Sequence, residues 1–193
     1  MGRVTECGKA TGTRLASRNR NCNFPGLMVK YLLNQKQLQR IFVMDYSLMT
    51  EADIARIAAL YMDCYNNCED GCRTQEKAWR RIHQMVTIED SLCLIQWDHD
   101  GNVTGFAIGY FKQYDDCLAY YLEEIVILAA YQDRGLGTAF LKEIERRIRE
   151  RGAEHLELTS VNDEHHCHFY TRFGMYADAN LKVMGKHYSA DSD

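Results

Sequence analysis

A glycine-containing turn, Gln132-x-x-Gly135-x-Gly137, joins an apolar segment to an amphipathic segment in the second half of the chain. The apolar segment reads EEIVIL and the amphipathic one reads GTAFLKEIERRIRER, which predicts a strand, a turn and a helix. The first N–H groups of a helix have no partner within it and lie at the positive end of its dipole. Because glycines keep side chains out of the way, this junction could bind a phosphate group.

Two common phosphate-binding motifs do not fit this turn. A P-loop needs Gly-x4-Gly-Lys-[Ser/Thr], and the chain contains no such string. A dinucleotide fingerprint needs a third glycine three residues after Gly137, but Phe140 occupies that position. The sequence therefore argues against a nucleoside triphosphatase and against a dinucleotide-binding enzyme.

The turn resembles the [Arg/Gln]-x-x-Gly-x-[Gly/Ala] motif with which the GNAT superfamily of N-acetyltransferases binds acetyl-CoA. Downstream, the string HFYTRFGM is similar to the family pattern [Leu/Phe]-Tyr-x-[Lys/Arg]-x-Gly-[Phe/Met]. The resemblance spans about residues 41–188. It departs from the family at Ala129 or Ala130, where many members have proline, and in the interval from Asn162 to Tyr170, which is about one residue longer than the commonest spacing.

The resemblance implies acetyl-CoA as cosubstrate and assigns residues to its binding. The strand before the turn would diverge from the next strand, so that its free backbone groups hold pantetheine and polarise the acetyl carbonyl. The turn would bind the pyrophosphate, with Arg134 adding charge at the rim, and Asn162 would bind one of the two arms through its amide. The residues expected to bind the cosubstrate are Ile125, Val126, Ile127, Gln132, Asp133, Arg134, Gly135, Leu136, Gly137, Thr138 and Asn162.

Two adjacent carboxylates, Glu123 and Glu124, interrupt the apolar strand and are the candidates for the base that removes a proton from the acceptor ammonium. Neighbouring residues in a strand point to opposite faces, so at most one of the two is expected in the cleft. Glu157, in the next strand, is the reserve candidate. By resemblance, Tyr170 would donate a proton to the departing CoA thiolate.

The expected reaction is transfer of acetyl from acetyl-CoA to a primary amine of a small molecule or protein, by direct attack in a ternary complex. The alternative is a catalytically silent acyl-CoA-binding or interaction module of the same fold. Glu69, Asp70, Asp115 and Asp116 could surround the acceptor entrance and favour a polycationic amine, or they could be ordinary solvated loop acids. The sequence leaves a homodimer open.

No metal site is expected. Cys64, Cys68 and Cys72 are separated by three residues rather than the two of common zinc sites, and neighbouring histidines within His165–His168 point apart on a helix. The eight cysteines are expected to be reduced thiols, and the absence of a long apolar run predicts a cytoplasmic protein without membrane contact.

The elements that must position these residues read in the order βααβββαβαβ. This order predicts an α/β fold (α+β mixed sheet), with a central, mostly antiparallel sheet and helices on both faces. Thr50 and Asp53 resemble a capping box that opens the first helix, DHDGN suits a hairpin turn, and one or two closing strands are expected over residues 176–188.

Residues 1–38 form a basic tail without sustained periodicity, and residues 39–193 are expected to form the N-acetyltransferase domain. Residues 1–40 carry eight Lys and Arg and one Glu, which is a net charge of +7. Because the net charge of the whole chain is −4, the remaining residues carry a net charge of −11. The tail could be a transit segment, or sequence upstream of a natural start at Met28 or Met44. A nucleic-acid role for the tail is a third, weaker interpretation, because few aromatic residues interleave its charges. The acidic body favours cationic partners over nucleic acid.

Overall fold

The structure, a computed structural model, describes residues 44–68 and 74–188. Predictions for the tail and for Glu69, Asp70 and Cys72 lie outside these residues. The elements are β1 (Asp45–Leu48), η1 (Glu51–Asp53), α2 (Ile54–Cys68), α3 (Gln75–Thr87), β2 (Leu94–Trp97), β3 (Val103–Gln113), β4 (Leu118–Ile127), η2 (Ala129–Tyr131), α4 (Leu136–Glu150), β5 (His155–Leu158) and α5 (Glu164–Thr171).

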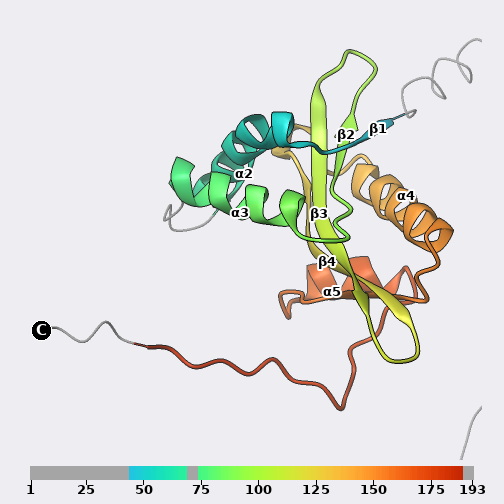
Figure 1. Cartoon of the computed structure of the whole chain (residues 1–193). Coiled ribbons are helices and arrows are strands. Elements are labelled where there is room, and N and C mark those ends of the chain that lie inside the picture. Colours follow the sequence, from blue (N-terminus) through green and yellow to red (C-terminus); the bar gives the residue numbers. More distant parts are fainter. Residues whose placement is uncertain (1–43, 69–73, 189–193) are drawn as a thin grey trace, which may run out of the picture. The chain divides into compact units, whose positions relative to one another are not determined.

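The five strands form one mixed sheet in the order β1-β2-β3-β4-β5. The first four strands pair antiparallel, and β5 pairs parallel with β4 after the crossover through α4. Figure 1 shows α2 and α3 on one side of the sheet and α4 on the other. The predicted mixed, mostly antiparallel sheet with helices on both faces is confirmed.

Short sequence signals set the ends of several elements. The Asp53 carboxylate accepts a hydrogen bond from the Thr50 backbone N–H at 2.9 Å, as the predicted capping box requires. Gly101 takes a φ of 78° in the turn between β2 and β3, and Gly152 takes a φ of 86° just after α4. Because left-handed backbone favours glycine, these residues end the elements where the sequence predicted.

The prediction of closing strands over residues 176–188 is wrong. This segment contains no strand, and its large apolar side chains at Tyr176, Leu181, Val183, Met184 and Tyr188 are 74 to 91% exposed. A strand needs a hydrogen-bonded neighbour as well as suitable residue types, and the segment pairs with no described strand.

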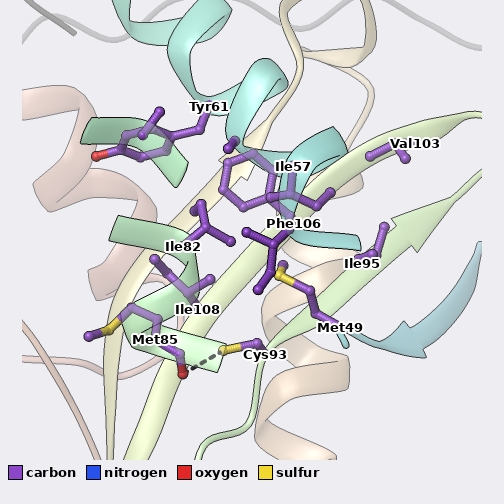
Figure 2. Packing of buried hydrophobic residues seen from close by; sticks show 13 residues of the cluster. Met49, Ile57, Tyr61, Ile82, Met85, Cys93, Ile95, Val103, Phe106 and Ile108 are labelled. Atoms are coloured by element: carbon purple, nitrogen blue, oxygen red, sulfur yellow. Dashed lines mark hydrogen bonds between the residues drawn. The ribbon is translucent and has the colours of Figure 1, made fainter. Parts of the chain in front are cut away.

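Two apolar clusters hold the layers together. On one face, Ile57 and Ile82 of the helices pack with Phe106 and Ile108 of β3, as Figure 2 shows. On the other face, Phe140 and Ile144 of α4 pack with Tyr120 and Leu122 of β4. The sheet therefore fixes where α4 begins and where β4 ends.

None of the helices among residues 44–68 and 74–188 combines the length and the apolar character needed to cross a membrane.

An ion-pair network ties α4 to β1 and predicts a pH-dependent stability. Glu143 accepts hydrogen bonds at 2.7 to 2.8 Å from Arg146 and at 2.7 Å from Arg147, and Arg147 also donates to the Tyr46 carbonyl at 3.2 Å. The bonds from Arg146 are the main cause that lowers the pKa of Glu143 from 4.5 to about 2. Because this pKa is lower in the folded than in the unfolded protein, the ionised carboxylate stabilises the fold at pH values above the unfolded pKa of 4.5. This stabilisation is lost as the pH falls toward 2.

We therefore expect Glu143→Gln to lower the free energy of unfolding at neutral pH by about 1 kcal/mol. The difference from the wild type should be smaller at about pH 3, where Glu143 contributes less. Urea unfolding of both proteins at the two pH values measures this. An equal difference at both pH values would contradict the assignment.

Candidate active site

The turn between β4 and α4 exposes the start of the helix. Gly135 precedes α4 with a φ of 77° and, as the N-cap residue, has no side chain with which to cap the helix. A Cβ added at Gly135 would meet nothing within 4 Å, whereas one at Gly137 would lie 3.6 Å from Ile127 and Phe169. The N–H groups of Leu136, Gly137 and Thr138 lie in the first turn, where a helix offers donors to an anion. This arrangement offers backbone donors to a phosphate group.

Other residues predicted at the turn have partners within the protein. Gln132 donates from its amide to the Ile127 carbonyl at 2.9 Å, so its side chain closes the turn onto the end of β4. The Arg134 guanidinium lies 5.8 Å from the ring centre of Tyr131, at the rim of the turn. Asp133 has a left-handed φ of 59°, and Gly135 is left-handed as well.

The strand before the turn diverges from the next strand, as the family resemblance implied. Pairing between β4 and β5 covers only Ala119 to Leu122, opposite His155 to Leu158. The rest of β4, which includes Ile125, Val126 and Ile127, continues to pair with β3 but has no described partner strand on the β5 side. Backbone groups on that open side can accept or donate hydrogen bonds to an extended ligand.

A β-bulge brings the two candidate carboxylates together. Ile108 lies opposite Glu124 and Gly109 opposite Leu122, so Glu123 is the extra residue of β4. One nitrogen of Arg81, on α3, lies 2.8 Å from Glu123 and 3.4 Å from Glu124. Both glutamates therefore contact the same guanidinium, because the bulge interrupts the alternation of side chains from which opposite faces were expected.

Glu124 is the more firmly held member of the pair. Its carboxylate accepts hydrogen bonds from the hydroxyls of Tyr61 at 2.9 Å and Tyr65 at 2.7 Å, both on α2. The Glu124 side chain is 13% exposed and that of Glu123 is 22% exposed. The sequence analysis did not predict Arg81 or these tyrosines, although the spacing of Tyr61 and Tyr65 places both on one face of a helix.

Tyr170 lies in α5 and packs against the apolar cluster below α4. Burial raises its pKa above the ordinary value for tyrosine. Within the described part of the chain, its hydroxyl makes no hydrogen bond. Asn162 is exposed, and its amide oxygen lies 3.9 Å from the Cys167 sulfur.

The remaining acidic candidates contact other residues or lie in a loop. Glu157 contacts Lys112 at 3.2 Å and the Tyr114 hydroxyl at 3.0 Å. Asp115 and Asp116 are exposed in the loop between β3 and β4. Among the residues that the structure describes, no three His, Cys, Asp or Glu side chains are grouped in a way that could hold a metal ion.

Three of the solved structures with the same fold are named as acetyltransferases with different acceptors. Ribosomal-protein-alanine N-acetyltransferase from Brucella melitensis biovar Abortus 2308 is 18% identical, with a TM-score of 0.62 over 75% of this chain and 100% of that chain. Glucosamine-6-phosphate N-acetyltransferase from Arabidopsis thaliana is 14% identical, with a TM-score of 0.57 over 76% of this chain and 99% of that chain. An aminoglycoside N-acetyltransferase in complex with CoA is 12% identical, with a TM-score of 0.58 over 76% of this chain and 96% of that chain.

These identities are low, so the structural likeness shows the fold alone. A search of curated protein sequences gave no match. The family model for the acetyltransferase (GNAT) family matches residues 54–175, which run from the start of α2 to just beyond α5 and include the turn and the carboxylate pair. The chain therefore belongs to the acetyltransferase (GNAT) family.

Proposed function

We propose that the protein transfers the acetyl group of acetyl-CoA to a primary amine of a small molecule or protein, by direct attack in a ternary complex. The observation that carries the proposal is the continuity of one segment, from Glu123 to Gly137. It begins with two carboxylates at a bulge, continues as a strand end open on one side, and ends at the uncapped start of α4.

Each part of the segment has a role in this reaction. The carboxylate pair takes a proton from the acceptor ammonium, directly or through water, because only the free amine is a nucleophile. Backbone groups of Ile125 to Ile127 hold pantetheine and polarise the acetyl carbonyl. As the N–C bond forms and the C–S bond breaks, Tyr170 donates its proton to the departing thiolate. Asn162 and the turn around Gly135 hold the CoA.

The acceptor is tested with a panel of amines. The structural neighbours are named for an aminoglycoside, an amino-sugar phosphate and a protein alanine, so the panel contains one of each and a polyamine. Release of the CoA thiol from acetyl-CoA measures turnover, and mass spectrometry locates the acetyl group. Acetylation of at least one amine supports the proposal, whereas binding of acetyl-CoA without turnover on any amine favours the catalytically silent module.

Tyr170→Phe is expected to lower kcat by roughly 100-fold, because the variant removes the proton donor for the thiolate. The raised pKa of Tyr170 keeps its hydroxyl protonated, so this group should cause no fall in the wild-type rate between about pH 7 and about pH 9. Tyr176→Phe, at a tyrosine that is 83% exposed, serves as the control. Equal activity of both variants at saturating acetyl-CoA would remove Tyr170 from the mechanism.

A further inference from the structure

A buried amide connects the sheet to the first residue of α4. Gln96, in β2, is fully buried, and its amide nitrogen donates to the carbonyl of Leu136 at 3.3 Å and to the Tyr46 hydroxyl at 3.1 Å. Its amide oxygen accepts from the Thr104 hydroxyl at 2.9 Å, and Thr104 is fully buried in β3. All polar groups of this side chain are therefore satisfied inside the protein.

An amide in this position needs an explanation beyond packing. Its neighbours Leu94 and Ile95 are buried apolar residues, and an apolar side chain at 96 would be buried without needing hydrogen bonds. Two hydrogen bonds of this amide stay within the sheet, to Tyr46 of β1 and Thr104 of β3, and only the bond to Leu136 reaches α4. That bond fixes the carbonyl directly after Gly135, at the end of the turn.

The opposite end of the turn is fixed in the same way. The Gln132 amide donates to the Ile127 carbonyl, so glutamine side chains hold the turn at both of its ends. Between these bonds, Asp133 and Gly135 take left-handed backbone conformations, and no side chain caps α4. The direction of the N–H groups of Leu136, Gly137 and Thr138 thus depends on where the sheet holds the start of the helix.

We infer that Gln96 is a positioning residue that sets the helix N-terminus for the phosphates of CoA. This inference rests on the proposed function, because it presumes that the turn binds acetyl-CoA. Gln96 acts through α4 and touches neither the thioester nor the amine. Its loss should weaken binding of the phosphate-bearing part of CoA and leave the reacting end unchanged.

The test compares two variants of the same buried network. Gln96→Met has a similar volume but lacks the donor to Leu136. Thr104→Val removes the hydrogen bond that the Thr104 hydroxyl donates to the Gln96 amide oxygen and keeps the bond to Leu136. Both proteins are titrated with CoA by calorimetry and with pantetheine, which has no phosphate, by NMR. We expect Gln96→Met to weaken CoA binding by about three- to tenfold, as for the loss of one hydrogen bond.

For pantetheine, Gln96→Met should bind within about twofold of the wild type, and Thr104→Val should do so for both ligands. An equal loss for CoA and pantetheine, an equal loss in the two variants, or no loss in Gln96→Met would overturn the inference. Gln96→Asn, which draws the amide back from Leu136 by one methylene, carries the same test if the methionine variant does not fold. Failure of the wild type itself to bind CoA would overturn the proposed function, which is a distinguishable result.

Discussion

Replacement of both Glu123 and Glu124 by glutamine is expected to lower kcat by roughly 10²- to 10⁴-fold, the range for loss of a general base. Both carboxylates contact the same guanidinium nitrogen of Arg81, at the point where β5 separates from β4, so we assign the proton acceptor to this pair. Glutamine keeps the size of each side chain but cannot take a proton from the acceptor ammonium. Steady-state kinetics on an identified amine, at saturating acetyl-CoA, measures the effect.

The two single substitutions should not be additive. Removing one carboxylate leaves Arg81 to pair with the other, so each single change alters the environment of the remaining glutamate. We expect both Glu123→Gln and Glu124→Gln to reduce kcat, with the double variant close to the more impaired single variant. Full activity of the double variant, with loss in Glu157→Gln, would transfer the role to Glu157 and contradict this assignment.

Gly135→Glu is expected to weaken acetyl-CoA binding by at least about tenfold, since a carboxylate near a phosphate costs on the order of 1 to 4 kcal/mol at a protein surface. The space around a Cβ at this position is open, so the new side chain need not disturb the core. It would place negative charge at the end of α4 that is expected to attract the pyrophosphate.

Gly152→Glu is the matched control for this prediction. Gly152 follows the other end of the same helix, has a φ of 86° beside the 77° of Gly135, and likewise has nothing within 4 Å of an added Cβ. Both variants carry the same backbone strain and the same added charge. Equal affinities of the two variants for acetyl-CoA would show that the start of α4 does not bind the phosphates.

Local patterns in the sequence were sufficient to predict the elements that carry the site. The capping box at Thr50, the hairpin glycine Gly101 and the helix end at Gly152 depend on interactions within a few residues. The divergence of β4 from β5 was predicted through the family resemblance, and the structure has pairing end at Leu122. The capping box and the glycine turns are visible in the sequence because each is encoded close to where it acts.

The features that sequence analysis missed depend on contacts between distant segments. Arg81 is 42 residues from Glu123, Tyr61 is 63 residues from Glu124, and Gln96 is 40 residues from Leu136. Strict alternation along β4 predicted that Glu123 and Glu124 point to opposite faces, but the bulge at Glu123 interrupts that alternation. The predicted closing strands are absent because residue types alone do not supply a neighbouring strand.

Calorimetric titration of the wild-type protein with acetyl-CoA tests the central claim most directly, with NADH and ATP as controls. The account predicts saturable binding of acetyl-CoA that is much tighter than that of either control and is weakened in Gly135→Glu but not in Gly152→Glu. Absence of acetyl-CoA binding by the folded wild-type protein would contradict the account and reduce the glycine turn to a structural connection between β4 and α4.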